Sequence, residues 1–406
     1  MSYARAASYL LSAAIFSVVG CAPATPPNNN PGGNGGSAGG NPGDGSGGDP
    51  GDDSGGNTPR PAATTVRVHY PAGSHTLAIR GDGAGLTWDV GQPLAAGADD
   101  TYSFTVADLA APLEFKPLLD DATWSRGPNY KVAPGTTVDV YPHFTTVTGT
   151  VEKLIATFHS TTLGNDRAVW AYLPPSYAEN TRARFPVLYM HDGQNLFDPA
   201  LAFGGNEWKV DETLDAAAED GSIEELIVIG VENTAQRIYE YTPTTDPSTA
   251  GGGGGDQYLA MLVTELKPQI DAMLRTVPDR AHTGLVGSSL GGLISAYAGV
   301  KRPDVWGIVG AMSPSTWWNS EVIIGDVGGM PMGARPARVY VDSGDSGTSN
   351  DDVTNTNQLA ATYVNIGYTS GVDFLHVVQA GGQHNEVYWA ERLPGALQFL
   401  FGPRNP

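Results

Sequence analysis

A glycine-flanked serine in this chain has the setting of a nucleophile. Ser289 lies in the segment Gly-Ser-Ser-Leu-Gly-Gly at 287–292, which contains the pattern Gly-x-Ser-x-Gly. Strand-like residues 284–286 precede this segment, and helix-like residues 293–297 follow it. A serine on a sharp turn from a strand into a helix needs small neighbours, and such a turn aims the first amides of the helix at a reacting carbonyl. Ser289 is therefore the candidate nucleophile, whereas Ser288 is expected to point elsewhere.

A histidine later in the chain is the candidate base. A serine hydroxyl is a poor nucleophile at neutral pH and needs a general base. His384 lies in the glycine-flanked loop Gly-Gly-Gln-His-Asn-Glu, after a predicted strand at 374–378. His376 lies within that strand, so we expect it to be a packed or edge residue. His384 also keeps the chain order of nucleophile, acid and histidine that is typical of serine hydrolases built on a strand-to-helix turn.

The acid is expected in the loop after a predicted strand at 339–342, and this loop carries several carboxylates. Asp345 comes directly after the turn, and Asp351 precedes the next predicted helix. We favour Asp351, with Asp345 as the second candidate. The acid would hold His384 in one tautomer and stabilise its imidazolium form.

An oxyanion hole requires backbone N–H groups at the developing negative charge. The N–H of Leu290 is the expected first donor, because this residue follows the nucleophile. The second donor is expected from the loop His-Asp-Gly-Gln-Asn at 191–195, where Gly193 and Gln194 are the candidates. His191 and Asp192 could also begin a metal site, but no cluster of further ligands accompanies them in the sequence. We therefore predict neither a metal nor a cofactor.

The elements that would position these residues follow an α/β pattern. Apolar strand-length runs alternate with helix-length segments over 150–406, which predicts an α/β domain with a mainly parallel sheet covered on both faces. The predicted strands are 169–173, 187–191, 226–231, 284–287, 308–312, 339–342 and 374–378. The predicted helices are 212–219, 257–275, 290–301, 356–363 and 387–400, and the glycine run 251–255 is expected to be a flexible loop.

Residues 66–147 carry short runs with alternating apolar residues, separated by Gly, Pro and Asp. This period of two predicts an antiparallel, all-β sandwich domain. Trp88 and Trp124 lie in turn-like segments, where an aromatic ring could either stack on a sugar or pack into the core. The stretches around 86–89, 113–116 and 124–130 resemble starch-binding type carbohydrate-binding modules. That resemblance implies that Trp88 and Trp124 flank a glycan.

The sequence of the first 65 residues predicts a secretion signal followed by a flexible linker. Arg5 precedes an apolar stretch, and the sequence Val-Val-Gly-Cys ends at Cys21, the lone cysteine. Residues 1–20 therefore fit a secretory signal, and they resemble a bacterial lipoprotein signal, which implies that Cys21 is lipidated and anchors the chain to a membrane. The residue after Cys21 is not Asp, which favours the outer membrane. Residues 21–65 are rich in Gly, Pro, Asn, Asp and Ser and predict a disordered linker.

The overall composition excludes several classes of protein. The chain has 406 residues, with 22 Lys and Arg against 43 Asp and Glu, for a net charge of −21. Nucleic acid would be repelled, since no cluster of Lys and Arg offsets the acidic balance. A single cysteine excludes an intrachain disulfide and a cysteine-rich metal site. No uninterrupted apolar run is long enough to cross a bilayer as a helix.

With these residues assembled, the region from about 155 to 403 closely resembles the putative-esterase family of α/β-hydrolases. That family includes enterochelin, feruloyl and acetyl-xylan esterases, S-formylglutathione hydrolase and mycolyltransferases. The resemblance is carried by Tyr-Leu-Pro-Pro-Ser-Tyr at 172–177, Pro-Val-Leu-Tyr-Met-His-Asp-Gly-Gln-Asn-Leu-Phe-Asp at 186–198, Arg-Ile-Tyr-Glu-Tyr-Thr-Pro at 237–243, the Ser289 turn, Met-Ser-Pro-Ser at 312–315 and Gln-His-Asn-Glu at 383–386.

The resemblance implies that Ser289 and His384 are catalytic and that the acid follows the seventh strand. Arg237, Glu240 and Tyr241 match a segment that lines the site in relatives, although a surface ion pair beside a packed tyrosine is an alternative. We therefore predict a serine esterase that acts through an acyl-enzyme on small-molecule or carbohydrate-linked esters. The alternatives are a siderophore esterase of the enterochelin type, an acyltransferase, or a surface glycan-binding lipoprotein without catalysis.

Overall fold

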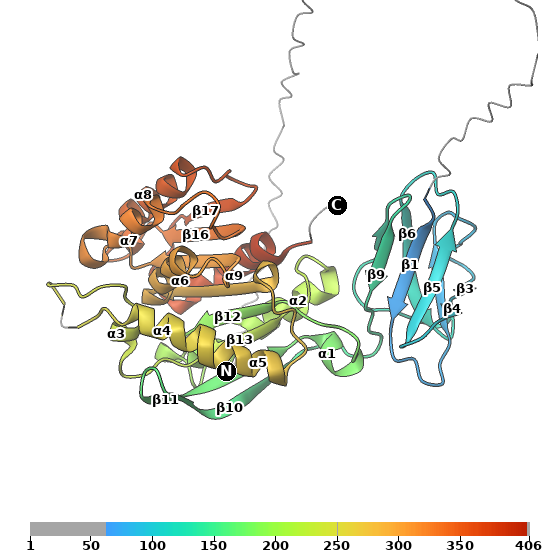
Figure 1. The fold of residues 1–406 in the computed structure, drawn as a ribbon, viewed down its shortest axis with the longest axis horizontal. Coiled ribbons are helices and arrows are strands. Elements are labelled where there is room, and N and C mark those ends of the chain that lie inside the picture. The colour runs from blue at the N-terminus through green and yellow to red at the C-terminus, as the bar shows by residue number, and fades with distance from the viewer. Residues whose placement is uncertain (1–61, 250, 404–406) are drawn as a thin grey trace, which may run out of the picture. The chain divides into compact units, whose positions relative to one another are not determined.

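The structure is a computed structural model that describes residues 62–249 and 251–403 of the chain (Figure 1). The predicted signal at 1–20, Cys21 and most of the predicted linker at 21–65 lie outside the described residues. Within the described ranges, no helix has both the length and the apolar composition needed to cross a membrane.

Nine short strands occupy residues 64–140 and form two sheets (Figure 1). They are β1 (Thr64–His69), β2 (Leu77–Gly81), β3 (Gln92–Pro93), β4 (Ala95–Ala96), β5 (Thr101–Val106), β6 (Leu113–Leu119), β7 (Thr123–Trp124), β8 (Tyr130–Val132) and β9 (Thr137–Val140). One sheet has the order β4-β5-β1-β9, and the other has the order β3-β2-β6-β7 with β8 paired to β6. The strands β1 and β9 pair in parallel, whereas the sequence analysis expected antiparallel pairing throughout.

Both sheets contribute side chains to one hydrophobic cluster. Val66 and Val68 of β1 are buried in it, together with Ile79 of β2 and Phe115 of β6. Arg67, between the two valines, is exposed. This alternation is the period-two pattern of a strand with one buried face.

The residues from 150 onward form one eight-stranded sheet in the order β10-β11-β13-β12-β14-β15-β16-β17 (Figure 1). Its strands are β10 (Thr150–Ser160), β11 (Asn165–Leu173), β12 (Val187–His191), β13 (Ile227–Val231), β14 (Thr283–Ser289), β15 (Ile308–Pro314), β16 (Arg338–Gly344) and β17 (Phe374–Gln379). The first two strands are antiparallel to their neighbours, and all pairs from β13 to β17 are parallel.

Helices cover both faces of this sheet. They are α1 (Pro175–Glu179), α2 (Val210–Asp220), α3 (Arg237–Glu240), α4 (Gly255–Met261), α5 (Lys267–Met273), α6 (Leu290–Lys301), α7 (Trp318–Gly328), α8 (Val353–Asn365) and α9 (Glu386–Phe401), with short 3-10 turns η1 (Gly193–Asn195), η2 (Phe203–Gly205), η4 (Arg280–His282) and η5 (Asn350–Asp352) and a π-helical turn η3 (Leu262–Leu266). Helices α4 to α8 pack on one face, and α2 and α9 pack on the other. The prediction of a mainly parallel α/β sheet is confirmed.

The alternating direction of side chains along each strand explains the two packed layers. In β12 every residue is buried, with Val187 and Tyr189 in one hydrophobic cluster and Leu188 and Met190 in the other. A strand covered on both faces is expected to be apolar throughout rather than alternating. The carboxyl ends of β12 and β14 to β17 lie at one edge of the sheet, and the loops that leave them carry the candidate residues.

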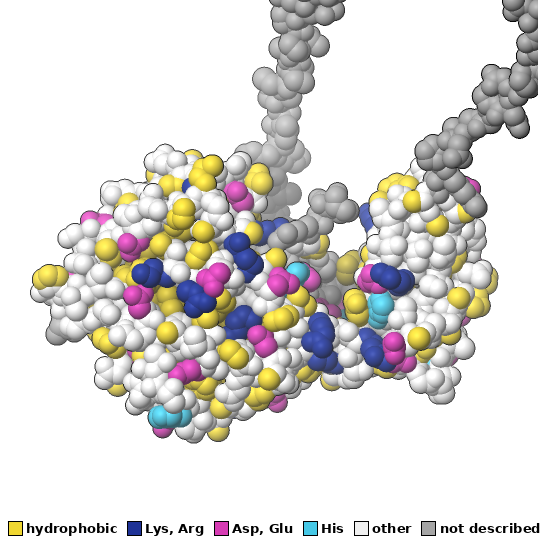
Figure 2. Space-filling model, in the orientation of Figure 1, with side chains coloured by type: hydrophobic (Ala, Val, Ile, Leu, Met, Phe, Trp, Pro, Cys, Tyr) yellow, Lys and Arg dark blue, Asp and Glu magenta, His cyan; other side chains and the backbone are white. Residues whose placement is uncertain are grey.

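The surface mixes charges of both signs. On the face shown in Figure 2, Lys and Arg side chains lie among Asp and Glu side chains rather than in a continuous basic patch.

Candidate active site

Ser289 stands at a strained turn between β14 and α6. It is the last residue of the strand, and the helix begins at Leu290. Its φ of 60° and ψ of −125° lie outside the regions that residues other than glycine normally adopt. Such strain persists only where the surrounding structure imposes it, and it is concentrated at functional sites. The sequence-predicted turn is therefore present, with its serine half-buried in a pocket.

Close packing beneath the turn explains the glycine two residues before the serine. A Cβ on Gly287 would lie 2.7 Å from a ring carbon of His191 and 2.8 Å from the backbone of Gly291. His191 is buried, and its Nδ1 lies 2.9 Å from the hydroxyl of Tyr258. Burial lowers the pKa of His191 to about 3, which keeps the ring neutral. The structure thus gives His191 a packing role under the nucleophile.

His384 and Asp351 form a hydrogen-bonded pair. His384 lies between β17 and α9, and its Nδ1 is 2.5 Å from Oδ1 of Asp351. A carboxylate only accepts hydrogen bonds, so Nδ1 carries the proton and Nε2 is left as an acceptor. His384 lines the same pocket as Ser289. The next residue, Asn385, caps α9 by accepting a hydrogen bond from the amide of Val387, which ends the loop at this point.

Three donors hold Asp351 as a carboxylate. Burial alone would raise its pKa, but the hydrogen bonds from His384, Ser313 and the Gly344 amide outweigh that effect and hold the pKa of Asp351 below its usual value. The Ser313 hydroxyl donates at 2.6 Å and the Gly344 amide at 2.5 Å, both to Oδ2. Asp351 is therefore ionised at neutral pH, as the partner of a catalytic histidine must be.

Asp345, the second candidate acid, has a different partner. Its Oδ1 accepts a hydrogen bond from the amide of Gly381 at 2.7 Å. The two carboxylates belong to the same loop after β16, but the 3-10 turn η5 brings only Asp351 to the imidazole. The structure thus pairs His384 with Asp351. Asp345 instead links the loop after β16 to the loop after β17.

The expected oxyanion donors lie at the starts of two helical turns. Leu290 is the first residue of α6, so its N–H has no carbonyl to bind within the helix. Gln194 lies in η1 and lines the pocket. Gly193, the preceding residue of η1, is buried, and a Cβ there would lie 2.4 Å from the backbone of Gly230. Both candidates for the second donor therefore lie in η1, and Gln194 is the one that lines the pocket.

Arg237 and Asp192 hold the loop that carries Gln194. The Arg237 guanidinium binds both carboxylate oxygens of Asp192 at 2.8 Å, and the Asn233 side chain donates to Oδ1 at 2.6 Å. The Asp192 amide donates to the Tyr241 hydroxyl at 3.3 Å. A guanidinium that meets both oxygens of a carboxylate fixes the orientation of both groups. Arg237 therefore lines the pocket while its charge is balanced by Asp192.

Glu240 and Tyr241 do not line the pocket, although the family resemblance implied that they would. Both side chains are fully buried. Glu240 binds the guanidinium of Arg167 on β11 at 2.8 and 2.9 Å, and Tyr241 packs under Arg237, with 5.1 Å between the guanidinium carbon and the ring centroid. Arg237 and Glu240 lie on one short helix but meet different partners, so the surface ion pair considered as an alternative does not form between them. Their role is to support α3.

The pocket that joins these residues has a volume of about 450 Å³. Its walls are Asp192, Gln194, Asn195, Phe203, Asn233, Arg237, Ser288, Ser289, His384, Asn385, Glu386 and Trp389. The sequence analysis missed Asn195, Phe203, Asn233, Glu386 and Trp389 as pocket residues. Glu386 and Trp389 could have been found from their closeness to His384 along the chain. No motif marks Phe203, whose side chain is 77% exposed at the pocket.

The serine next to the nucleophile in space was also missed. Ser315, after β15, lies with its Oγ 3.4 Å from Ser289 Oγ, and its amide donates to the carbonyl of Ser289 at 2.9 Å. The stretch Met-Ser-Pro-Ser was noted only as a family signature. Its place in the fold, at the carboxyl end of the strand beside β14, is the signal that could have identified it.

Trp88 and Trp124, the candidate glycan-binding residues, lie side by side. Their ring centroids are 6.2 Å apart with an interplanar angle of 35°, and the side chains are 37% and 38% exposed. The guanidinium carbon of Arg80 lies 5.2 Å from the centroid of Trp124. The two rings thus form a partly exposed aromatic surface, and the alternative of simple core packing does not describe them.

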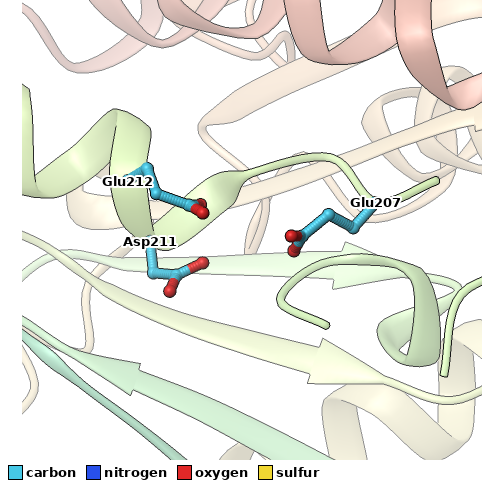
Figure 3. Close-up of side chains that lie close together, drawn as sticks. All are labelled: Glu207, Asp211 and Glu212. Atoms are coloured by element: carbon cyan, nitrogen blue, oxygen red, sulfur yellow. The ribbon is translucent and has the colours of Figure 1, made fainter. Parts of the chain in front are cut away.

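Three carboxylates gather at the start of α2 (Figure 3). The side chains of Glu207, Asp211 and Glu212 turn toward one another, with ligand-type oxygens within 4.8 Å. Burial and repulsion from the neighbouring acids raise the pKa of Glu207 to about 7. In the described part of the chain this is the one group of His, Cys, Asp and Glu close enough to share an ion. It is not part of the Ser289 pocket, and its closeness alone is no evidence of an ion.

Comparison with known proteins assigns a family to this arrangement. Residues 160–400 match the family model described as "Putative esterase". The chain is 30% identical over 149 residues to the siderophore triacetylfusarinine C esterase of Aspergillus fumigatus, which covers 35% of this chain and 48% of that protein. It is 26% identical over 169 residues to an endo-1,4-beta-xylanase/feruloyl esterase of Xylanibacter ruminicola, which covers 41% of this chain and 22% of that protein. The chain thus aligns with less than half of each of these two relatives.

One further relative aligns over more of the chain, and one solved structure shares the fold. The chain is 29% identical over 248 residues to the uncharacterized protein YbbA of Bacillus subtilis, which covers 58% of this chain and 93% of that protein. The crystal structure of an IroE-like serine hydrolase from Shewanella oneidensis superposes with a TM-score of 0.50 at 21% identity, over 62% of this chain and 80% of that one. At that identity the likeness supports the fold alone.

Proposed function

The chain belongs to the family described as Putative esterase, and we propose that it hydrolyses carboxylic esters through an acyl-enzyme on Ser289. The observation that carries the proposal is the meeting of a strained serine with the hydrogen-bonded pair His384–Asp351 at one pocket. A nucleophile, a base and a group that orients the base are the parts that acyl transfer through serine requires.

In the first half of the reaction, Ser289 Oγ attacks the ester carbonyl while His384 Nε2 takes the hydroxyl proton. The carbonyl oxygen becomes an oxyanion, which the amides of Leu290 and Gln194 stabilise. The tetrahedral intermediate then collapses, the C–O bond to the alcohol breaks, and His384 protonates the leaving oxygen. Asp351 remains a carboxylate and stabilises the imidazolium.

In the second half, a water molecule replaces the alcohol. His384 takes a proton from this water as its oxygen attacks the acyl carbon, and the oxyanion forms again in the same place. Collapse of the intermediate releases the carboxylic acid, and Ser289 Oγ recovers its proton from His384. Each proton taken is returned, so the reaction consumes only ester and water.

The test is hydrolysis of short p-nitrophenyl esters by the wild type and by Ser289→Ala. Loss of the nucleophile is expected to lower kcat by about 10⁶-fold, since other serine hydrolases lose roughly that much. Ser288 lines the same pocket although it was expected to point elsewhere, so the control is Ser74→Ala, which removes an exposed hydroxyl outside the pocket and should stay within a few-fold of the wild type. Equal rates for the wild type and Ser289→Ala would refute the proposal.

For the substrate, we propose an acyl group carried on a carbohydrate, such as an acetyl or feruloyl ester. The exposed ring of Phe203 at the pocket offers an apolar surface to a planar acyl group, and the Trp88–Trp124 surface suits a sugar. The relative from Xylanibacter ruminicola, named a xylanase/feruloyl esterase, is in line with this choice.

A siderophore ester is the second candidate, favoured by the name of the Aspergillus fumigatus relative. An acyltransferase is the third, because the same acyl-enzyme would pass its acyl group to a sugar hydroxyl if water were excluded. A panel of acetylated xylan, methyl ferulate and enterobactin separates these candidates by relative kcat/KM. A preference for enterobactin would overturn the carbohydrate assignment while leaving the esterase assignment in place.

We further propose that residues 66–147 form a β-sandwich domain that binds glycan, next to a hydrolase domain at 150–406. The shared core of the two small sheets supports a sandwich, and the paired rings of Trp88 and Trp124 support a sugar platform. In the full chain, Trp88→Ala or Trp124→Ala should abolish retention on insoluble polysaccharide. Trp317→Ala, which removes a similarly exposed ring from the region after β15, is the control and should be retained like the wild type.

For the N-terminus, we propose that residues 1–20 are a lipoprotein signal and that lipidated Cys21 holds the enzyme at the bacterial outer membrane. This proposal is supported by the sequence Val-Val-Gly-Cys and by the apolar stretch before it. Cys21→Ala should move the esterase from the membrane fraction to the soluble fraction. Membrane retention of Cys21→Ala would contradict the anchor.

A further inference from the structure

Behind the carboxylate of Asp351 lies a buried network that the reaction as described above does not use. It consists of Ser313 at the end of β15 and Arg392 on α9, which are 0% and 6% exposed. We infer that Ser313 and Arg392 are positioning residues, which act through Asp351 to align and charge-balance the His384 base. This inference rests on the proposed function, because it concerns the same triad.

The direction of each hydrogen bond at Ser313 follows from its partners. Trp389 Nε1 lies 2.9 Å from Ser313 Oγ, and Arg392 Nη2 lies 2.7 Å from it. Both of these groups can only donate, so the hydroxyl oxygen accepts from both. The single hydroxyl proton is then left for Asp351 Oδ2, at 2.6 Å. The network therefore has one arrangement, in which Ser313 always donates to the triad carboxylate.

The backbone at Ser313 is held in an unusual conformation to reach this position. Its φ is 37°, and its amide donates to Asp342 Oδ1 at 2.9 Å. A positive φ at a residue other than glycine is strained, and surrounding contacts must impose it. Here the Asp342 bond fixes the backbone while Trp389, Arg392 and Asp351 fix the side chain. This convergence on one hydroxyl points to a positional role.

Arg392 lies between two buried carboxylates. Its Nε is 2.9 Å from Asp342 and its Nη2 is 3.7 Å from Asp351, while Nη1 donates to Gln379 Oε1 at 2.7 Å. Both carboxylates are 0% exposed. Burial raises the pKa of Asp342, while Arg392, the Ser313 amide and the Tyr340 hydroxyl act to lower it. When both carboxylates are ionised, one guanidinium leaves one negative charge, which the imidazolium of His384 neutralises when it takes the serine proton. Without the Arg392 cation, two buried carboxylates near His384 would strongly favour protonation of its imidazole.

The charged and titratable groups that face this network come from β16, η5, α9 and the loop before α9. On α9 they are Arg392 itself and Glu386, whose carboxyl interacts with the charge of His384. His384 contacts Asp351, and Tyr340 of β16 donates to Asp342 at 3.0 Å. Asp352 lies next to Asp351 in η5, and its carboxylate accepts from the Trp317 amide. Of these groups, only Arg392 carries a permanent positive charge. Removal of that charge should therefore make the imidazolium easier to form and the neutral base harder to keep.

The test compares kcat, KM and the pH profile of kcat/KM on a short ester for Ser313→Ala, Arg392→Met and Arg392→Lys. Ser313→Ala is expected to lower kcat by roughly 10- to 100-fold with KM nearly unchanged, because misplacement of a catalytic group by about 1 Å costs up to ~10² in rate. Arg392→Met is expected to shift the acidic limb of the profile upward by about half a pH unit or more, since a lost positive charge favours the imidazolium. Arg392→Lys keeps the positive charge, so the acidic limb of its profile should lie where the wild-type limb lies.

Lys267→Met is the matched control for stability. It removes another buried cation, which pairs with Asp271 on α5 away from the pocket, so it should lower the unfolding temperature and leave the pH profile unchanged. A purely structural role for Arg392 predicts the same behaviour for Arg392→Met. Wild-type kcat and an unshifted limb in folded Ser313→Ala and Arg392→Met would overturn the inference.

A spectroscopic readout separates this inference from the esterase assignment. The proton between His384 Nδ1 and Asp351 should give a low-field NMR resonance in the wild type, and Ser313→Ala should move or broaden it. An unmoved resonance would count against the network whatever the substrate is. An inactive wild type would refute the proposed function. An active wild type whose kcat and pH profile are unchanged by the Ser313 and Arg392 substitutions would refute only the inference. If Arg392→Met does not fold, the kinetics and pH profiles of Ser313→Ala and Arg392→Lys still test whether the network positions the triad.

Discussion

At the scale of single residues, the two acids of the loop after β16 offer a matched pair. Asp351 touches His384, while Asp345 touches the amide of Gly381. In a serine protease, the change of the triad aspartate to asparagine leaves the geometry intact and lowers kcat by about 10⁴-fold, because the histidine is held in the wrong tautomer. Asp351→Asn is therefore expected to lose activity by a similar order, with KM little changed.

Asp345→Asn is the control for that prediction. It keeps the shape of the side chain and an oxygen that can accept from Gly381, so kcat should stay within a few-fold of the wild type. Both variants are compared in steady-state hydrolysis of a short ester. A large loss in Asp345→Asn with an active Asp351→Asn would reverse the assignment of the acid.

These residues also show how far the sequence can be taken. Ser289 and His384 could be placed because the strand, the turn and the chain order constrain them. For the acid, the sequence favoured Asp351 over Asp345, but a long loop with several carboxylates has no pattern that says which one turns inward. In the structure that choice depends on Gly344 and Ser313, two donors that lie on different strands and meet only after folding.

At the scale of elements, α3 depends on a buried ion pair for its position. Glu240 of this four-residue helix binds Arg167 of β11, and both side chains are 0% exposed. Asn165 and Thr234 also donate to the Glu240 carboxylate, at 2.7 and 3.1 Å. Such a short helix has little stability of its own. The pair therefore fixes the segment from which Arg237 reaches the pocket.

Arg167→Met is expected to lower the free energy of unfolding by about 3–5 kcal/mol, because removal of one partner leaves the other as an uncompensated buried charge. Arg302→Ala is the control. It breaks the pair with Asp304, in which the side chains are 33% and 62% exposed, and exposed pairs contribute only about 0–1 kcal/mol. Urea denaturation of both variants measures the difference. Equal stability of the two variants would show that the buried pair does not hold α3.

Two of the elements that the sequence analysis missed, β10 and α3, have a physical reason in common. β10 is the edge strand, and most of its residues are exposed or half-buried, so its pattern carries no apolar run. α3 is too short to show a helical period. The glycine run was expected to be a flexible loop over 251–255; residues 251–254 lie outside the helices and named strands, and α4 begins at Gly255. Contacts made after folding define β10 and α3.

At the scale of the whole molecule, stability should depend on pH in two opposite ways. Hydrogen bonds from the backbone and side chains of 144–146 outweigh burial and lower the pKa of Glu179 to about 2, and those from 160–162 do the same for Glu265. A carboxyl group with a lowered pKa stabilises the fold above its ordinary pKa and loses that effect as the pH falls. The fold should therefore weaken as the pH falls from about 4.5 toward 2.

Glu207 acts in the other direction. Its pKa is about 7 in the fold, against an ordinary value of 4.5, first because it is buried and then because Glu212 and Asp211 repel its charge. A carboxyl group with a raised pKa favours the fold when protonated, so this contribution is complete below about 4.5 and is lost as the pH rises through 7. The net charge of −21 adds general repulsion at high pH. Together these effects place maximum stability at about pH 5.

Glu207→Gln isolates the local contribution. Glutamine keeps the size of the side chain and removes the charge, so the variant should be more stable than the wild type at pH 8, by about 1 kcal/mol once solvent screening of this half-exposed group is included. The gain should shrink as the pH falls through 7 and vanish near 4.5, where the wild-type carboxyl is also neutral in the fold. Glu152→Gln, at an exposed position on β10, is the control and should show no such dependence. Unfolding free energies measured by urea denaturation from pH 4.5 to 8 check the prediction. A gain for Glu207→Gln that is constant across this range would show that the variant acts through packing rather than through the shared charge of the three carboxylates.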